Sequence, residues 1–537
     1  MKRRSFLKSS IATGAILSVN ACQTPKKNEK NIEKRKDEFL LNEKSISDLQ
    51  QAFVDGSLTS VEVIKLYMDR IESIDKQSPG LNSIIEMNPD AIEIARSLDE
   101  DRKNGKGKGP LHGIPIMLKD NIDTSGKMMT TAGSLALEGN YCTENSWVAQ
   151  KLVDAGAIIL GKTNLSEWAN FRSLRSSSGW SGRGGQTKNP YITDRNPCGS
   201  SSGSGVAVSA NLCTAAIGTE TNGSIVCPSS TNGIVGIKPT VGLVSRSGII
   251  PIAHSHDTAG PMARTVEDAA VILGTLTGLD EKDTYTKRSE GKSYTDYTSS
   301  LNDDALRNKR IGVAKHFLGF HGEVDKLMEI AIQDLKNHGS KIIEIEKNEL
   351  NNESSPDAYE VLLYEFKHDL NLYLNSCNSN VKARSLEQLI AFNLEHISQE
   401  MPYFDQEIFI AAQEKGDLKT DDYKRALENV LKSNGPEGID KVMDKYEVDV
   451  IIAPTGAPSW PIDVINGDHF MGGSSSPAAR SGYPNITVPM GFIHGLPVGI
   501  SFFAEAFSEP KLISFAYAYE QATKHRKPPK FIPTFTY

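Results

Sequence analysis

Apolar side chains recur at helical spacing in several stretches of this 537-residue chain. In the clearest stretch, which starts at Ser60, one face is apolar and consists of Val63, Ile64, Tyr67, Met68, Ile71 and Ile74. Thr59 and Glu62 have the spacing of a capping box at its start. A second helix is predicted to begin at Asn88-Pro89, because proline suits the first helical position. Its common face holds Ala91, Ala95, Leu98 and Arg102.

Helical and strand patterns alternate along the rest of the chain. The predicted strands are 157–160, 342–345, 450–453, 485–488 and 498–503, and helices over 148–155 and 326–337 precede the first two. The segment from about 357 to 446 is polar, is predicted to be mainly helical, and carries no catalytic motif. We interpret it as a helical lobe at the mouth of a substrate site. The whole pattern predicts a mixed α/β fold.

Two loops rich in glycine and serine flank the apolar run 206–217. The first is Gly-Ser-Ser-Ser-Gly-Ser-Gly over 199–205, and the second is Gly-Thr-Glu-Thr-Asn-Gly-Ser-Ile over 218–225. Upstream, Lys119 follows the apolar residues Met117 and Leu118. Together these segments offer a nucleophile, a bridging hydroxyl and a base, which suffice to attack an amide without histidine or metal.

A serine hydroxyl needs a neighbouring base, and a lysine can be that base only when it is neutral. Removal of water lowers the pKa of a lysine, so the apolar residues before Lys119 favour this role. Glycines beside the serines free main-chain N–H groups to stabilise an oxyanion. Thr221, Asn222 and Gly223 form the best candidate loop for that purpose.

These motifs resemble those of the amidase signature family, and they look closest to its peptide amidase branch. The two serine motifs of the family correspond to 198–204 and 218–226, and its lysine motif corresponds to 113–123. Further matches lie at 161–164, 233–240, 257–261, 453–455, 483–489 and 495–499. The resemblance covers almost everything from about Leu41 onward, and so many motifs in order are highly specific.

The resemblance implies one large domain whose mixed β-sheet is covered by helices on both faces. It also implies a role for three residues. Ser224 would be the acyl-ester nucleophile, Lys119 would be the base, and Ser200 would be the bridging serine that relays a proton, often next to a cis peptide bond. No cofactor is implied.

This chain departs from the commonest family pattern at three positions. Glu220 stands where aspartate is usual, Asn222 where glycine is usual, and Val226 where arginine is usual. The last change removes a possible charge partner of Glu220. None of the three is a catalytic position, and together they argue against the transamidosome subunit branch.

The sequence therefore predicts a serine amidohydrolase that converts carboxamides, in particular peptide C-terminal amides, into acid and ammonia. Three alternatives stay open: an aryl- or fatty-acylamide hydrolase, an amidotransferase subunit acting on misacylated tRNA, and a non-catalytic lipoprotein that binds amides. Within 176–185, Trp180 and Arg183 are candidates for substrate binding, and a purely structural loop is the competing interpretation.

Other motifs favour structural roles. Ser73 and Lys76 match the Ser-x-x-Lys pattern of penicillin-recognising enzymes, but the partner motifs are missing, so a solvated helix end is the better interpretation. The glycine loops lack the Gly-Lys-Ser/Thr ending of a phosphate loop. Cys198 and Cys227, near the expected site, are interpreted as small packed residues. His254 and His256 lack an apparent third ligand, so no metal site is predicted.

The N-terminus resembles an export signal. Arg3-Arg4 followed by an apolar step is typical of twin-arginine signals, and residues 1–21 suit a cleaved signal peptide. Cys22 ends a stretch that resembles a lipoprotein box, and 22–40 reads as a charged tether before the domain at 41–537. We therefore expect an exported protein, periplasmic or anchored to the membrane by an N-terminal lipid.

Composition adds one exclusion. The chain has 59 Lys and Arg against 67 Asp and Glu, a formal net charge of −8, which argues against nucleic acid as a partner. Its 38% hydrophobic and 23% charged residues are ordinary for a globular protein. The expected partner is the amide substrate, and no obligate protein partner is predicted.

Overall fold

The computed structural model describes residues 39–350 and 355–535. The predicted signal at Arg3-Arg4, the lipidation site Cys22 and most of the tether lie outside the described residues. The chain divides into two units, 1–42 and 43–537. Of the first, only residues 39–42 are described, and they enter a turn. The second contains every described helix and strand.

A mixed sheet of 11 strands forms the centre of the second unit. Its order is β1 (Ile84–Met87), β3 (Ile158–Thr163), β2 (Pro115–Lys119), β6 (Ala215–Glu220), β8 (Thr258–Ala263), β7 (Val235–Lys238), β12 (Asn485–Ile493), β13 (Leu496–Phe503), β11 (Val450–Pro454), β9 (Arg310–Ala314) and β10 (Lys341–Ile345). Strands β3, β2 and β6 are parallel neighbours, as are β11, β9 and β10, and the remaining pairs are antiparallel. A separate hairpin pairs β4 (Trp180–Ser181) with β5 (Gly185–Gln186).

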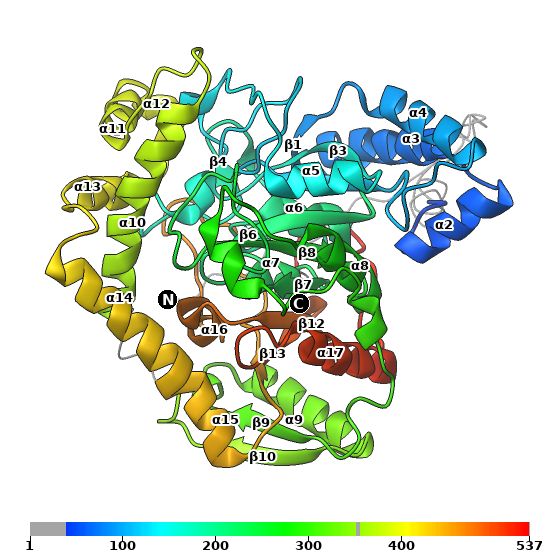
Figure 1. The fold of residues 1–537 in the computed structure, drawn as a ribbon, viewed down its shortest axis with the longest axis vertical. Coiled ribbons are helices and arrows are strands. Elements are labelled where there is room, and N and C mark those ends of the chain that lie inside the picture. Colours follow the sequence, from blue (N-terminus) through cyan, green and yellow to red (C-terminus); the bar gives the residue numbers. More distant parts are fainter. Residues whose placement is uncertain (1–38, 351–354, 536–537) are drawn as a thin grey trace, which may run out of the picture. The chain divides into compact units, whose positions relative to one another are not determined.

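Every residue of the central strands β2, β3, β6, β8, β11 and β13 is buried, which requires cover on both faces of the sheet. The helices around the sheet include α2 (Ile46–Asp55), α3 (Ser60–Arg70), α4 (Ala91–Lys103), α5 (Trp147–Asp154), α6 (Ser202–Ser209), α7 (Val226–Thr231), α8 (Val266–Leu276), α9 (Gly322–Asn337), α16 (Ser476–Ser481) and α17 (Glu509–Thr523) (Figure 1). The expected mixed sheet between helices is confirmed.

Short helical turns complete the secondary structure. They are η1 (Ile71–Lys76), η2 (Leu135–Leu137), η3 (Glu167–Asn170), η4 (Thr284–Ser289), η5 (Thr298–Ser300), η6 (Lys315–Phe317) and η7 (Gly435–Asp440). Within the described residues, no helix combines the length and the hydrophobicity needed to cross a bilayer.

Helix α3 confirms the predicted capping box, because Thr59 and Glu62 each cap the other's main-chain N–H. Helix α4 starts later than predicted: Asp90 is the N-cap, its N–H donates to the side chain of Asn88, and Pro89 precedes the helix instead of opening it. The pairs α5–β3 and α9–β10 match the predicted helix–strand pairs.

The Ser-x-x-Lys pattern belongs to the surface of the fold. The Ser73 hydroxyl donates to the main-chain oxygen of Arg70, and the Lys76 ammonium donates to that of Ile84. Both polar groups therefore satisfy main-chain carbonyls, as the structural interpretation predicts.

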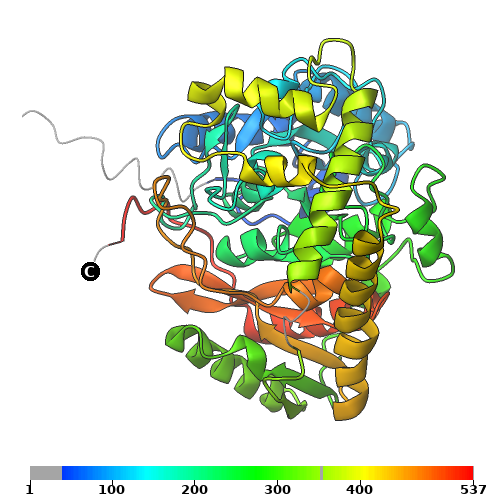
Figure 2. The same cartoon turned by 90° about the vertical axis from the view of Figure 1, so that its left-hand side faces the viewer.

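The region 357–446 is helical, with α10 (Ser355–Ser376), α11 (Leu386–Glu395), α12 (Ile397–Glu400), α13 (Glu407–Gln413), α14 (Asp421–Asn434) and α15 (Lys441–Tyr446). Figure 2 shows α10 and α14 along one side of the sheet. Phe366 and Leu370 of α10 share a buried cluster with Ala132 and Trp168. The helical lobe therefore packs directly on the loops that follow β2 and β3.

Candidate active site

The three predicted catalytic residues meet at one edge of the sheet. Lys119 is the last residue of β2, which lies parallel to β6 with Leu118 opposite Ile217. The carboxyl ends of parallel neighbours lie at the same edge, so the loop after β6 emerges beside Lys119. Ser224 lies in that loop, and Ser200 lies in the loop before α6.

Lys119 is fully buried and its Nζ atom has three polar neighbours. These are the Ser200 Oγ at 2.7 Å, the Thr219 Oγ1 at 2.8 Å and the Thr219 main-chain oxygen at 3.3 Å. A neutral amine has two N–H groups and one lone pair. It can donate to both Thr219 oxygens while its lone pair accepts the Ser200 hydroxyl.

Burial lowers the pKa of Lys119 to about 7, although the charges of Asp257 and Glu220 act in the opposite direction. A substantial fraction of the amine is therefore neutral near pH 7. This is the protonation state in which a lysine can take a proton from a hydroxyl.

The two serine loops are held side by side. The Ser201 N–H donates to the Ser224 main-chain oxygen at 3.2 Å, and the peptide bond between Gly199 and Ser200 is cis. Within the described residues, the Ser224 hydroxyl has no hydrogen-bond partner, and its residue is 8% exposed. It does not bond to Ser200, so the Ser224 Oγ is free to meet a substrate.

Two glycines permit close contacts of these serine loops with their neighbours. A β-carbon on Gly199 would lie 2.1 Å from the Ser166 Oγ, and one on Gly218 would lie 2.8 Å from the Ser201 Oγ. A larger residue at 218 would push the two serine loops apart, and a larger residue at 199 would collide with the loop that follows β3.

The loop before Ser224 offers main-chain donors. Across the part of the chain that the structure describes, the N–H groups of Asn222, Gly223 and Ser224 meet no acceptor. The side chains of this loop are tied down instead: Thr221 donates to the Asp257 carboxylate at 2.5 Å, and Asn222 accepts from the Ser475 hydroxyl at 2.7 Å. Fixed, unpaired donors of this kind suit a developing oxyanion.

Glu220 has a role that its sequence context did not reveal. One carboxylate oxygen accepts the N–H groups of Ile225 at 2.7 Å and Val226 at 3.0 Å. These bonds close the loop around Ser224 from its far side. Glu220 is thus satisfied by main-chain donors, although Val226 offers it no charge.

Cys198 and Cys227 form a disulfide, so their interpretation as separate packed residues is wrong. The bond joins the residue two positions before Ser200 to the residue three positions after Ser224. A sequence separation of 29 gave no metal-type or local signal for this pairing. The disulfide adds a covalent link between the two serine loops.

Two cavities open beside these loops. Cavity A, about 400 Å³, is lined by Gly199, Asn222 and Gly223 and, from the segment that the sequence singled out, by Ser176 and Ser178. It therefore reaches the residue that precedes each of the two serines, Gly199 before Ser200 and Gly223 before Ser224.

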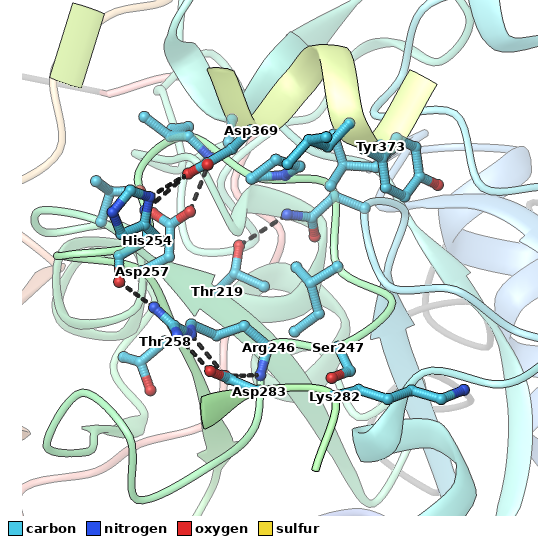
Figure 3. Close-up of a pocket in the computed structure, with 18 residues that line it drawn as sticks. Thr219, Arg246, Ser247, His254, Asp257, Thr258, Lys282, Asp283, Asp369 and Tyr373 are labelled. Atoms are coloured by element: carbon cyan, nitrogen blue, oxygen red, sulfur yellow. Dashed lines mark hydrogen bonds and ion pairs between the residues drawn. The ribbon is translucent and has the colours of Figure 1, made fainter. Parts of the chain in front are cut away.

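Cavity B, about 340 Å³, is a second pocket, lined in part by residues of β6 and of the loop after it (Figure 3). Thr219, Thr221 and Asp257 line it from the sheet side, and Asp369 and Tyr373 reach it from α10. The helical lobe therefore contributes directly to the wall of this cavity.

Trp180 and Arg183 line neither cavity A nor cavity B. The Trp180 ring is 5% exposed and packs edge-on against Tyr403 and Phe404 of the helical lobe. Arg183 forms an ion pair with Glu86 at 2.5 Å. Their surroundings are those of structural residues, and the cavity-lining members of this segment are its serines.

His254 lies close to two carboxylates that are distant from it in the sequence. Its Nδ1 lies 2.7 Å from Asp369 (Figure 3), and its Nε2 lies 3.4 Å from Glu365; both carboxylates belong to α10. Burial opposes protonation of the ring, but the hydrogen bond to Asp369 and the charge of Glu365 raise the pKa of His254. We interpret the cluster as an ion-paired histidine that ties the loop before β8 to the helical lobe.

Comparison with known proteins agrees with this geometry. The family model described as Amidase matches residues 62–513. A probable amidase of Arabidopsis thaliana is 41% identical over 504 residues, which cover 92% of this chain and 93% of the relative. The solved peptide amidase from Stenotrophomonas maltophilia is 48% identical, with a TM-score of 0.88 and coverage of 92% and 99%. An amidase family protein from Bacillus anthracis is 35% identical, with a TM-score of 0.82 and coverage of 94% and 95%.

Proposed function

Since this chain belongs to the amidase family and is an amide-hydrolysing enzyme, we propose that it removes the C-terminal carboxamide nitrogen of peptides as ammonia. Ser224 is the nucleophile, Ser200 relays the proton, and Lys119 is the base. The observation that carries this assignment is the 2.7 Å contact between the Lys119 Nζ and the Ser200 Oγ at a fully buried position.

In the acylation step, the Ser224 Oγ attacks the carboxamide carbon while its proton passes to Ser200, and the Ser200 proton passes to neutral Lys119. The N–H groups of Asn222 and Gly223 hold the oxyanion. Collapse of the intermediate breaks the C–N bond. The proton returns from Lys119 through Ser200 to the leaving nitrogen, so ammonia departs and an ester on Ser224 remains.

Deacylation repeats the relay with water. Lys119 and Ser200 take a proton from the attacking water, the ester bond breaks, and Ser224 recovers its proton. The products are the peptide acid and the regenerated enzyme. All proton transfers involve the same three side chains, so no further reactant is needed.

The choice of peptide amides rests on similarity. The peptide amidase from Stenotrophomonas maltophilia matches nearly the whole chain at 48% identity. Cavity A, beside Gly199 and Gly223, is of the size that small-molecule and short-peptide sites commonly have. Aryl and fatty-acyl amides, misacylated tRNA and simple binding without hydrolysis are the competing outcomes of the test.

The test measures hydrolysis of four substrates by the purified full-length protein. The products followed are ammonia from a peptide amide and from a primary fatty-acyl amide, aniline from an anilide, and the released C-terminal residue from the same peptide extended by one residue. Selective cleavage of the terminal carboxamide supports the proposal. Equal cleavage of the extended peptide at that bond would contradict it. Hydrolysis of none of the four substrates would favour the binding protein.

Variants test the roles of the side chains. We expect Ser224→Ala to lower kcat by at least about 10³-fold and to abolish labelling by a fluorophosphonate probe. Lys119→Ala should be nearly as damaging, and Ser200→Ala should keep a weaker residual rate. The triple variant should be little worse than Ser224→Ala, because the three groups act as one unit. Labelling of Ser224→Ala at the wild-type rate would refute the assignment.

A further inference from the structure

The turn at 168–170, which contributes one residue to each of the two cavities, has an unusual backbone. Trp168, Ala169 and Asn170 follow one another with φ values of 52°, 53° and 71°. Residues with a β-carbon seldom adopt this left-handed region, and a run of three is rarer still. Such conformations persist where the surrounding structure enforces them, and they cluster at functional sites.

The helical lobe enforces this turn from behind. The Trp168 ring packs against Phe409, and the Phe171 ring packs against Phe366 at a centroid distance of 5.0 Å. The Trp168 N–H also donates to the main-chain oxygen of Ala132. The turn therefore holds its side chains in fixed directions before a substrate arrives.

These directions place neighbouring residues in different cavities. Ala169 lines cavity B, whereas Asn170 lines cavity A together with Gly199 and Gly223. Asn170 thus shares cavity A with the residues that directly precede Ser200 and Ser224. Its left-handed φ is one that asparagine tolerates better than most residues.

The Asn170 side chain has no hydrogen-bond partner within the described residues, and its Oδ1 atom is buried. A buried amide oxygen without a partner is costly, so native structures usually satisfy it. An amide offers one acceptor and two donors on adjacent atoms, which match the N–H and C=O groups of a peptide main chain. The natural complement of this side chain is therefore another amide.

We propose that Asn170 is a specificity-determining residue that binds the peptide bond preceding the terminal carboxamide of the substrate. The scissile carboxamide itself is held at Ser224 and the loop before it. A simple amide has no second amide group and leaves Asn170 unpaired, so the enzyme selects peptide amides over simple aryl or fatty-acyl amides. This inference rests on the proposed function and names the feature of the substrate that the site recognises.

The experiment compares two substrates that share a phenyl ring and a primary carboxamide. N-acetyl-phenylalaninamide carries a preceding peptide bond, and 3-phenylpropanamide lacks it. Asn170→Gly deletes the side-chain amide and still permits a positive φ. We expect this variant to lower kcat/KM for the peptide amide by about 10-fold or more and to leave the simple amide within about twofold.

Asn308→Gly is the matched control, because Asn308 is exposed and also left-handed, with a φ of 62°. This control variant should leave kcat/KM unchanged for both substrates. If Asn170→Gly does not fold, Asn170→Asp keeps the shape and the tolerance of this backbone. The carboxylate cannot donate to the substrate carbonyl, so the ratio of the two kcat/KM values must fall here as well.

The inference and the proposed function fail differently. If wild-type protein releases no ammonia from N-acetyl-phenylalaninamide, the proposed function is wrong. A second outcome is that wild-type protein hydrolyses it, but the Asn170 variants leave the ratio of the two kcat/KM values unchanged or lower both values equally. In that case Asn170 does not bind the peptide bond of the substrate.

Discussion

The Nζ atom of Lys119 lies 2.7 Å from the Oγ of Ser200, at a position without solvent exposure. Within the described residues, the other hydrogen-bonding partners of this amine are the two oxygens of Thr219. No carboxylate touches it. The amine can therefore lose its proton at a much lower pH than an exposed lysine, which has direct consequences for activity.

Activity should rise with pH through about 7 and level off above it, because only neutral Lys119 can accept the Ser200 proton and burial lowers its pKa to about 7. The measurement is kcat/KM for a peptide amide between pH 5 and pH 10. The residual rate of Lys119→Ala should not show this rise with pH. A midpoint of the pH profile near 10, or the same rise with pH in Lys119→Ala, would contradict the role of Lys119.

Glu220→Gln should move that midpoint to lower pH. The charge of Glu220 raises the pKa of Lys119, so its removal favours the neutral amine at a given pH. The glutamine oxygen can still accept the N–H of Ile225 or Val226, so the loop keeps much of its support. The variant should therefore retain a larger fraction of its maximal rate at pH 6 than wild-type protein does. A midpoint at or above the wild-type value would rule this out.

The catalytic trio could be predicted from the sequence because each member sits in a short, contiguous motif. Lys119 ends a fully buried strand, and Ser200 and Ser224 stand in glycine-rich loops, which are local features. Parallel pairing of β2 and β6 then brings them together. Helices and strands with strong periodicity were predictable for the same reason.

Contacts between distant segments could not be predicted in this way. Trp180 looked like a cleft residue because it stands in a polar, glycine-rich loop, but its neighbours Tyr403 and Phe404 come from the helical lobe more than 200 positions later. The Cys198–Cys227 bond depends on how the two serine loops meet. Asn170 carried no sequence signal, since its left-handed backbone is set by packing on α10 and α13.

The disulfide should stabilise the fold at the site. It closes a loop with a sequence separation of 29, and restriction of the unfolded chain by such a loop contributes about 3–4 kcal/mol. We expect Cys198→Ser with Cys227→Ser to lower the thermal unfolding midpoint and to reduce kcat. Dithiothreitol should reproduce both effects in wild-type protein and have none on the double variant. Identical midpoints with and without reductant in wild-type protein would show that the bond contributes nothing.

We propose that the protein is exported, on the basis of Arg3-Arg4 and Cys22 and with support from the disulfide, since disulfides persist in oxidising compartments. Arg3→Lys with Arg4→Lys should leave the precursor in the cytoplasm. Cys22→Ser should release the mature protein from the membrane fraction if Cys22 carries a lipid. Fractionation with N-terminal sequencing checks both. A full-length chain in the cytosol with Met1 or Lys2 at its N-terminus would overturn the proposal.

Arg172→Met should destabilise the protein strongly. Arg172 lies 2.6 Å from Glu167 and 3.7 Å from Glu400, and all three side chains are fully buried. Removing the cation leaves buried carboxylates unpaired, which costs about 3–5 kcal/mol. Arg307→Met is the control, because Arg307 pairs with Asp304 at the surface, where an ion pair contributes about 0–1 kcal/mol.

The loss of stability caused by Arg172→Met should depend on pH. Burial raises the pKa of Glu167 well above its ordinary value even against the charge of Arg172, and without Arg172 the pKa must rise further. The folded state of the variant then holds a proton that the unfolded state releases above its ordinary pKa. Stability of the variant is therefore lost as pH rises. Urea unfolding at pH 5 and pH 8 should show a larger deficit relative to wild-type protein at pH 8, and an equal or smaller deficit there would contradict the buried ion pair as its cause.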